Sequence, residues 1–397
     1  MKSLADTLAI LVAAAKPLTS TESIPLLAAA GRYLAEDLHA TINVPPADNS
    51  AMDGYAVRAE DIASGDTWLP ITQTINAGSA PEPLAAGSAA RIFTGAEIPS
   101  GADTVVMQEN SERSTDGRQV KLAATQVGDN IRRCGQDIHQ GQLIFATGHR
   151  LAAVDVAVIA AIGLPTITVF RRVRVAILAT GNELVEPGQP LATGQIYNSN
   201  RYLLHTALTA LGCEVIDLGT AEDTLAGTEA ALRRGQEADL IITTGGVSVG
   251  EADFVKPAVT NLGTLESWKV AIKPGKPLAF GRIGETPLLG LPGNPVAVFI
   301  TFLLAVKTFI RALNHNREPL PTRPFAAEFS TSKSSDRTNY LRVKITTEGQ
   351  ISRFGNQSSG VLSSVAWADG LAIIPAGATV QSGEPLQVIL LNDYAFL

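Results

Sequence analysis

Residues 173–184 read VRVAILATGNEL, a continuous apolar run that is followed at once by a polar loop. A strand buried on both faces has this composition, because neither face meets water. The same pattern of an apolar strand and a polar loop recurs at 213–219 (CEVIDLG), 239–246 (DLIITTGG) and 287–295 (PLLGLPGNP). Helical segments are expected at 200–211, 224–237, 252–261 and in a long stretch that ends near Leu313. Repeated strand–loop–helix units predict a central parallel sheet with helices on both faces, a three-layer α/β domain.

Polar and glycine-rich residues follow each of these strands. In a parallel sheet, ligands bind at the carboxyl ends of the strands, where the loops gather. Thr244, Gly245 and Gly246, with Ser248 shortly after them, offer free backbone N–H groups before a helix, and such groups favour an anion such as phosphate. A tight strand-to-helix turn explains the glycines without a ligand, but the three other polar loops at the same edge favour a binding site.

Three acidic residues, Glu183, Asp223 and Asp253, lie in loops at that edge. Carboxylates repel a phosphate unless a cation lies between them, and Mg²⁺ acts in this way by taking one or two carboxylates together with substrate phosphates. A helix N-cap is the alternative for Asp223, because a helix follows it directly. Glu183 and Asp253 fit either a magnesium site or a solvated loop.

Three lysines, Lys269, Lys273 and Lys276, occur within WKVAIKPGKPLAF (268–280). The Pro-Gly-Lys-Pro sequence excludes a helix here. If residues 269–273 form one strand, Lys269 and Lys273 share a face. Two lysines on one face suit a phosphate, whereas an edge strand protected by lysine is the alternative. We interpret the segment as part of an anion site.

The remainder of the chain follows other patterns. The first forty residues predict two helices, the second beginning near Thr21 with Pro25 in its first turn. Residues 42–133 alternate short β runs with turn residues, and 151–162 return to a helix. After Pro321, strands such as YLRVKI (340–345) and PLQVILL (385–391) predict a small C-terminal β domain.

One loop of the β-rich part, VPPADNSAMDGYAV (44–57), contains four polar side chains: Asp48, Asn49, Ser50 and Asp53. Turn chemistry explains the first three, because side chains of these types bond nearby backbone groups. It explains Asp53 least well, since Gly54 frees the backbone beside it. We therefore expect a functional role for Asp53.

Composition excludes several classes of protein. The 397 residues require more than one domain, and 45% hydrophobic with 17% charged residues indicates well-filled cores. A net charge of −7 without a basic block argues against a nucleic-acid partner. Cys134 and Cys213 lie far apart and predict two buried thiols in a reducing compartment. The apolar stretches at 1–16, 151–170 and 296–306 are interrupted or too short to span a bilayer, so a soluble cytoplasmic protein is expected.

Seven segments together resemble one family closely, the molybdopterin molybdenumtransferases, which include the MoeA proteins and the E domain of gephyrin. They span most of the chain in the family's order. The segments are PPADNSAMDGYAV (45–57), FTGAEIPSGADTVVMQE (93–109), RRCGQDI (132–138), ATGNEL (179–184), TTGGVSVGEADF (243–254), KVAIKPGKP (269–277) and LPGNPVA (291–297).

The resemblance implies an enzyme that inserts molybdate into adenylylated molybdopterin and releases AMP. It implies Mg²⁺ as cofactor, a homodimer whose active site is shared between subunits, and contacts with a molybdopterin adenylyltransferase or with proteins that accept the cofactor. It also implies four domains. These are a helical linker domain (1–42 and 138–170), a β-rich domain (43–137), a molybdopterin-binding α/β domain (171–320) and a small C-terminal β-barrel (321–397).

The resemblance also marks functional residues by position. Those expected in catalysis are Asp53, Lys269, Lys273 and Asp253, with Glu183 and Asp253 as metal ligands. Those expected to bind substrate are Thr94, Asp137, Asp223, Pro292 and Pro295, to which the anion loop and the lysines add Thr244, Gly245, Gly246, Ser248 and Lys276. Asp53 would act across the dimer cleft, in the partner subunit's site.

Two other functions remain open from the sequence. A molybdopterin adenylyltransferase would share the α/β domain, although it needs nothing outside residues 173–313. Such an enzyme consumes ATP with molybdopterin, whereas the transferase consumes the adenylylated form without ATP. A peptide-binding scaffold like gephyrin is the second alternative, and the set of acids and lysines favours an enzyme over it.

Overall fold

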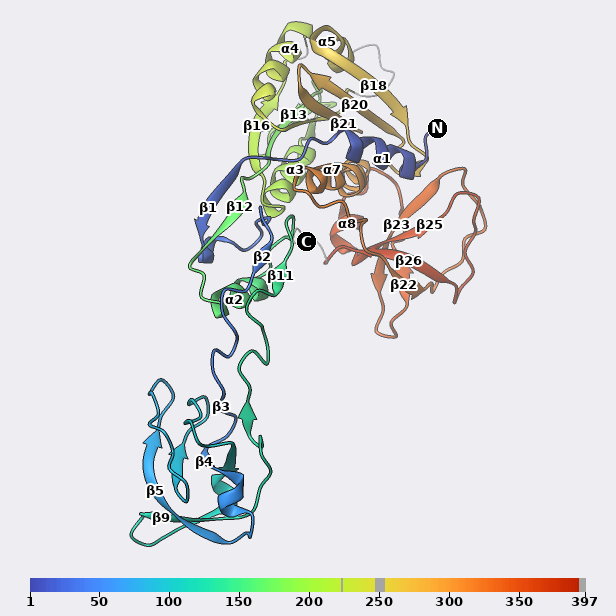
Figure 1. Cartoon of the computed structure of the whole chain (residues 1–397). Coiled ribbons are helices and arrows are strands. Elements are labelled where there is room, and N and C mark those ends of the chain that lie inside the picture. Colours follow the sequence, from blue (N-terminus) through green and yellow to red (C-terminus); the bar gives the residue numbers. More distant parts are fainter. Residues whose placement is uncertain (223, 247–253, 393–397) are drawn as a thin grey trace. The chain divides into compact units, whose positions relative to one another are not determined.

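The computed structural model of the chain describes residues 1–222, 224–246 and 254–392. The chain forms two compact units. Unit 1 comprises Met1–Glu22, Gly31–Tyr33 and Val169–Leu397, and unit 2 comprises Ser23–Ala30 and Leu34–Thr168. Figure 1 shows the elements of both units.

Unit 1 contains a six-stranded sheet in the order β16-β13-β17-β21-β20-β18. Its strands are β13 (Arg174–Ala179), β16 (Glu214–Thr220), β17 (Leu240–Thr244), β18 (Gly263–Lys269), β20 (Pro277–Ile283) and β21 (Thr286–Leu291). The four expected strands β13, β16, β17 and β21 are confirmed and pair in parallel. The sheet is nevertheless mixed, because β20 and β18 extend it with antiparallel pairing. A hairpin replaces the helical crossover that a parallel neighbour would need.

Helices cover both faces of this sheet. They are α1 (Leu4–Ala14), α3 (Ser199–Ala210), α4 (Leu225–Arg234), α5 (Val255–Leu262), α6 (Pro295–Thr301) and α7 (Lys307–Leu313), with the 3₁₀ turn η4 (Gly235–Glu237) and the π-helical stretch η5 (Phe302–Val306) that joins α6 to α7. Side chains of α4 and α5, including Leu232 and Val259, pack against Ala176 and Ile241. Figure 1 shows α1, α3 and α7 on the other side of the sheet. The expected three-layer α/β arrangement is therefore present.

The helix from Pro295 to Leu313 is the most apolar element of the sheet's helical cover. Its 19 residues are long and apolar enough to cross a membrane by length and composition, with a mean hydropathy of 2.1, and 89% of that window is buried inside the protein. It is the long buried helix that the sequence predicts at its position. Packing against β21 and α3 accounts for its composition.

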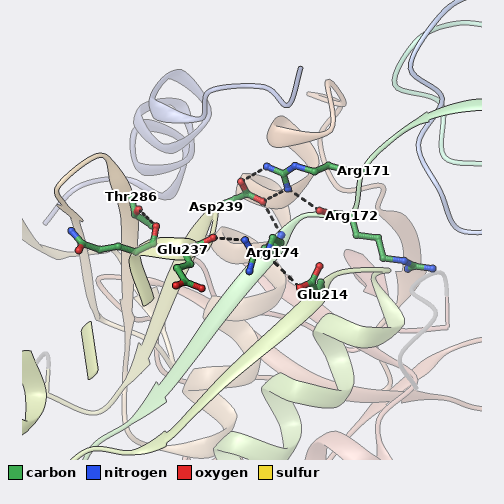
Figure 2. A network of polar contacts seen from close by, with 8 residues as sticks. Arg171, Arg172, Arg174, Glu214, Glu237, Asp239 and Thr286 are labelled. Atoms are coloured by element: carbon green, nitrogen blue, oxygen red, sulfur yellow. Dashed lines mark hydrogen bonds and ion pairs between the residues drawn. The ribbon is translucent and has the colours of Figure 1, made fainter. Parts of the chain in front are cut away.

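A polar network ties together the amino ends of the parallel strands (Figure 2). Asp239, just before β17, accepts hydrogen bonds of 2.7 Å from both terminal nitrogens of Arg171 and one of 2.8 Å from the backbone N–H of Arg174. This pairing raises the pKa of Arg171. The side chain of Arg174 in turn bonds Glu214 of β16 and the carbonyl of Glu237. The network lies at the edge opposite the loops in which a ligand is expected.

Replacing Asp239 with alanine should lower the stability of unit 1 by about 2 kcal/mol, because the bidentate pair with Arg171 and the acceptor of the Arg174 backbone N–H are lost together. Differential scanning calorimetry would measure the shift in melting temperature. Glu285→Ala is the matched control in the same unit, since its side chain is 88% exposed and meets Lys16 at 2.9 Å. An equal shift in both variants would show that the Asp239 network adds no stability.

A second sheet in unit 1 is formed by C-terminal residues together with β19 (Ile272–Lys273) of the lysine segment, residues 269–276. Its other elements are β22 (Arg323–Ala326), β23 (Thr338–Ile345), β24 (Ile351–Arg353), β25 (Gly370–Ile374) and β26 (Pro385–Leu390), with the helix α8 (Ser363–Trp367). The strand order is β19-β23-β25-β26-β22, with β24 on β23. Val343, Ile374 and Val388 lie in its core. The expected β domain is confirmed, whereas its closure into a barrel stays a prediction.

Unit 2 is mainly β-structure. Its main sheet has the order β7-β4-β6-β5-β9-β8 and consists of β4 (Gly54–Val57), β5 (Thr67–Ile75), β6 (Ala89–Ile92), β7 (Thr104–Met107), β8 (Ser111–Arg113) and β9 (Gln119–Leu122). Two short ladders pair β3 (Asn49–Ser50) with β10 (Ile131–Arg132) and β2 (Leu38–His39) with β11 (Leu143–Phe145). The remaining elements are α2 (Ala153–Ala161), η1 (Leu26–Ala28), η2 (Ala59–Ile62) and η3 (Gln108–Asn110).

Two expectations about the N-terminal half are wrong. Thr21–Pro25 forms strand β1, which pairs with β12 (Thr166–Phe170), and not a second helix. A partner strand that is distant in the sequence outweighs the local helix-capping signal. Cys134 is exposed, whereas only Cys213 is buried as predicted. All of residues 15–170 are described, and α2 is the single α-helix among them, so the helical linker and the four-domain division stay predictions.

Candidate functional site

A pocket of about 420 Å³ lies in unit 1 at the carboxyl edge of the α/β sheet. Loops after β17 and β21, the connection from β18 to β20 and the C-terminal sheet all contribute to it. The residues that line it are Gly245, Gly246, Lys273, Pro274, Gly275, Lys276, Pro277, Pro292, Gly293, Asn294, Ala297, Arg337, Gln357, Ser358 and Ser359. Five of the predicted site residues are therefore brought together: Gly245, Gly246, Lys273, Lys276 and Pro292.

The loop after β17 is shaped by its glycines. Gly245 has a φ of 81°, and a Cβ atom there would lie 3.0 Å from the carbonyl oxygen of Thr180. Only glycine fits this backbone conformation and this close approach. Thr244 is buried within β17, where its carbonyl accepts a hydrogen bond from the backbone of Thr180, and it does not line the pocket.

The lysine segment, residues 269–276, is a hairpin connection and not one strand. Lys269 ends β18, and Lys273 belongs to β19, which pairs in parallel with β23 of the C-terminal sheet. The expectation that Lys269 and Lys273 share the face of one strand is therefore wrong, because the chain leaves the α/β sheet between them. Lys273 and Lys276 line the pocket, and Lys269 does not.

The C-terminal sheet contributes pocket residues that the sequence did not reveal: Arg337, Gln357, Ser358 and Ser359. The sequence contains only one feature that could have pointed to them: Arg337 begins the RTNYLRV segment at 337–343. Arg337 also donates a hydrogen bond of 3.3 Å to the carbonyl of Ile272 in β19. The C-terminal domain is thus part of the site.

A buried arginine supports the serine loop of the pocket. Arg342 donates to the carbonyl of Ser358 at 3.1 Å and to the hydroxyl of Ser364 at 3.0 Å. The amide of Gln357 bonds both the N–H and the carbonyl of Arg342. Burial lowers the pKa of Arg342 to about 10, so the guanidinium still carries its charge at neutral pH.

The charges of the pocket identify its ligand class. Lys273, Lys276 and Arg337 are cationic, and no carboxylate occurs among the described residues that line it. Arg337 also meets the exposed Asp336 at 3.6 Å, outside the lining, so the lining itself stays cationic. Cations that outnumber nearby acids attract oxyanions, and an arginine fork binds two oxygens of one oxyanion. The glycine loop adds backbone N–H groups. The arrangement is suited to phosphate or to another tetrahedral oxyanion.

The predicted metal ligands are only partly within the described residues. Glu183 is exposed in the loop after β13, and its carbonyl accepts a hydrogen bond from the N–H of Ile196. Asp223, Ser248 and Asp253 lie outside the described residues. The N-cap of α4 is Thr224, whose hydroxyl accepts from the N–H of Gly227. Among the residues that the structure describes, no group of three or more His, Cys, Asp and Glu could hold a metal ion.

Asp53 and Thr94, both predicted from the resemblance, are in direct contact in unit 2. The carboxylate of Asp53 accepts hydrogen bonds from the N–H of Thr94 at 2.8 Å and from its hydroxyl at 2.7 Å. These bonds, the backbone bond first, lower the pKa of Asp53. Gly54 is required for a different reason than expected: a Cβ there would lie 2.0 Å from the carbonyl oxygen of Val106 in β7.

The other predicted residues have separate surroundings. Pro295 begins α6 and does not line the pocket, and Asp137 is an exposed residue whose N–H bonds the carbonyl of Val44. Ser50 makes the expected local turn, donating to the carbonyl of Met52 at 2.5 Å. Asp48 does not bond nearby backbone. It accepts from the side chain of Arg133 and the N–H of Cys134 across the β3–β10 ladder.

Thr94→Val should raise the pKa of Asp53 toward its ordinary value of about 3.9, because the hydroxyl donor is lost while the backbone donor remains. The sign follows from the native state: the bonds favour the ionised form, so they hold the pKa low, and removing one weakens that preference. NMR titration of the aspartate carboxyl carbons would measure it. Thr125→Val is the control, because it removes the equivalent hydroxyl bond to Asp129. An unchanged Asp53 titration in Thr94→Val would contradict the assignment.

Known protein families match almost the whole chain. The N-terminal region of MoeA (domains I and II) matches residues 2–163, a probable molybdopterin binding domain matches 176–312, and the C-terminal region of MoeA (domain IV) matches 326–391. The molybdopterin molybdenumtransferase of Haemophilus influenzae is 39% identical over 382 residues, which cover 94% of this chain and 95% of that protein. The chain belongs to the MoeA family.

Other MoeA relatives agree in sequence and in fold. The molybdopterin molybdenumtransferase of Bacillus subtilis is 34% identical over 94% of this chain and 90% of its own. A crystal structure of a molybdopterin biosynthesis MoeA protein from Pyrococcus horikoshii superposes with a TM-score of 0.81 at 32% identity, covering 98% of this chain and 99% of that one. Another crystal structure of a molybdopterin biosynthesis MoeA protein from Pyrococcus horikoshii gives a TM-score of 0.85 at 27% identity, with 98% of this chain and 100% of that one covered.

Proposed function

We propose that this chain is a molybdopterin molybdenumtransferase that inserts molybdate into adenylylated molybdopterin and releases AMP. The observation that carries the proposal is the pocket lined by Lys273, Lys276 and Arg337 without a carboxylate among its described residues. Both substrates are anions, one a tetrahedral dianion and the other a phosphoanhydride. Relatives with this name that are 34–39% identical support the proposal.

The chemistry calls for neutralised charge more than for a covalent intermediate. Cleavage of a phosphoanhydride increases negative charge on the leaving phosphate, and fixed cations in a restricted pocket stabilise that charge. Lys273 and Lys276 would bind the phosphates or molybdate as point charges. Arg337 would orient one oxyanion through its planar fork. The N–H groups of Gly245 and Gly246 would complete the anion's hydrogen bonds.

Mg²⁺ is proposed as the cofactor of this site. The donor chemistry fits: Glu183 offers carboxylate oxygens at the same edge of the sheet as the anion pocket, and Mg²⁺ commonly takes one or two carboxylates with substrate phosphates and water. Glu183 and Asp253 would hold the ion, which would neutralise phosphate charge when bound. Lys273, Lys276 and Arg337 would then need to neutralise only the remaining phosphate charge.

The decisive experiment measures AMP release from adenylylated molybdopterin with and without molybdate. Molybdate-dependent release, lost on chelation and restored by Mg²⁺, is the expected result. Consumption of ATP together with molybdopterin would instead identify an adenylyltransferase. No turnover together with a stable peptide ligand in a pull-down would favour a scaffold.

A homodimer in the cytoplasm is proposed as the working form, with Asp53 acting in the partner subunit's site. Support comes from an apolar surface on unit 2, which we call the α2 face. It includes Val154 of α2, 67% exposed, and Leu27 of the contacting turn η1, 96% exposed. The α2 sequence AVDVAVIAA has one charged residue, and a helix that is apolar all round is normally covered. A second copy of this chain is the proposed cover.

A further inference from the structure

The lysine segment depends on outside contacts for its conformation. It leaves the α/β sheet at Lys269 and returns at Pro277, which pair with each other across the β18–β20 hairpin. Between these two residues it presents Lys273 and Lys276 to the pocket. Each residue held in one conformation loses entropy, so a connection of this length needs bonds that fix it.

Two sets of these bonds come from the site itself. The hairpin is closed by a 2.8 Å hydrogen bond from the N–H of Val270 to the carbonyl of Lys276. The C-terminal sheet holds the other side, because the N–H of Thr338 donates to the carbonyl of Ala271 at 2.9 Å. Neither bond uses the carbonyl of Lys269 or the N–H of Ala271, so these two backbone groups need hydrogen-bond partners from another part of the chain.

Both of those groups bond Lys2. The N–H of Lys2 donates to the carbonyl of Lys269 at 2.9 Å, and the N–H of Ala271 donates to the carbonyl of Lys2 at 2.9 Å. Lys2 thus forms a parallel β-bridge with Val270, which lies between the two bonded residues. We call this pair of bonds the Lys2 rung. It adds a single strand residue to the beginning of the lysine segment.

The Lys2 rung is itself held in place. Ser3, the next residue, caps α1 by accepting a 3.0 Å hydrogen bond from the N–H of Asp6, and α1 packs against α7. The ammonium of Lys2 lies 5.0 Å from the ring centroid of Trp268, which is 6% exposed and directly precedes Lys269. The rung therefore connects the lysine segment to a packed helix.

We infer that residues 1–3 are a positioning element of the anion pocket, in which the Lys2 rung holds the lysine segment so that Lys273 and Lys276 face the ligand. The inference rests on the proposed function of that pocket as an oxyanion site. The hydrogen bonds of Lys2 go to the backbone of Lys269 and Ala271, which do not line the pocket, so Lys2 acts through that backbone. Loss of the Lys2 side chain should therefore reduce anion affinity less than loss of its backbone N–H.

With the same short N-terminal extension on every variant, so that Met1 is retained, Lys2→Pro tests the backbone bond, because proline within a chain has no N–H to donate to Lys269. Lys2→Ala is the matched control, since it keeps both bonds of the rung and removes only the cation–π contact. Isothermal titration calorimetry with molybdate, and separately with inorganic phosphate, measures the Kd of each anion for the pocket. Lys2→Pro should bind each anion about five- to tenfold more weakly, as expected when a backbone hydrogen bond that orders the site is lost.

The control should stay within about twofold of the wild type, because a cation–π contact at an exposed lysine is weak. In turnover, Lys2→Pro should raise the KM for molybdate more than it lowers kcat, with a melting temperature equal to that of Lys2→Ala. A purely structural role would lower the melting temperature and leave anion affinity unchanged. Equal anion binding by Lys2→Pro and wild type, or equal weakening by Lys2→Ala, would overturn the inference.

Two further measurements keep the test independent of how Lys2→Pro folds. Ala271→Pro removes the other bond of the rung and should weaken anion binding to a similar extent. In the wild type, the amide of Ala271 should exchange slowly with deuterium, and exchange at the rate of an unprotected amide would refute the rung. Anion binding that weakens as predicted in a protein that releases no AMP would support the rung and reject the proposed function.

Discussion

Lys273→Ala is expected to lower kcat for AMP release by about 10²- to 10³-fold, the size of effect seen when one preorganised charge or donor is removed from a transition state. Lys273 lines the pocket, and β19 fixes its backbone against β23. Its ammonium would meet negative charge where water is partly excluded. The loss should appear in kcat, because charge on the leaving phosphate grows during the reaction.

Lys333→Ala is the matched control for Lys273→Ala. Lys333 is an exposed lysine of the C-terminal domain that does not line the pocket. Its removal changes the net charge by the same amount, so it corrects for general electrostatics. Near-equal kcat values for the two variants would remove Lys273 from the proposed mechanism. Lys269→Ala should give a smaller loss than Lys273→Ala, because only the second lysine lines the pocket.

The α/β core could be predicted because its signals are local. An apolar run such as 173–180 followed by a polar loop and a helix identifies a buried parallel strand without knowledge of its neighbours. Strand β1 could not be predicted in this way. Thr21–Pro25 pairs with β12, more than a hundred residues along the chain, and its capping and proline signals also suit a helix. The pairing with the distant β12 is what makes this segment a strand.

The candidate site was predictable to the extent that its loops follow recognisable strands. Gly245, Gly246 and Pro292 come from such loops, and the structure brings them together. Arg337 and Ser359 were missed because their contribution depends on how the C-terminal sheet packs against the lysine segment. The same packing separates Lys269 from Lys273. Spacing in sequence describes one strand well, but it does not show where a chain passes from one sheet to another.

Val154→Asp is expected to weaken the proposed dimer by about 10²- to 4 × 10³-fold, because an unpaired charge buried in an apolar interface costs about 3–5 kcal/mol. Val154 is 67% exposed in the single chain, so the aspartate stays hydrated in the monomer and the fold of unit 2 should be unchanged. Sedimentation over a concentration series would measure the dimer's Kd. If Asp53 acts in the partner's site, AMP release should fall in parallel with the dimer fraction.

Val127→Asp is the matched control for Val154→Asp. Val127 is also in unit 2 and is 66% exposed, but it lies in a loop that does not belong to the α2 face. The same change of charge and volume there should leave the Kd of the dimer unaltered. Leu27→Asp, on η1, should act like Val154→Asp because it places the same charge on the same apolar surface. A dimer that resists both substitutions would mean that a different surface joins the subunits, since hydrated charges on an uncovered helix cost almost nothing.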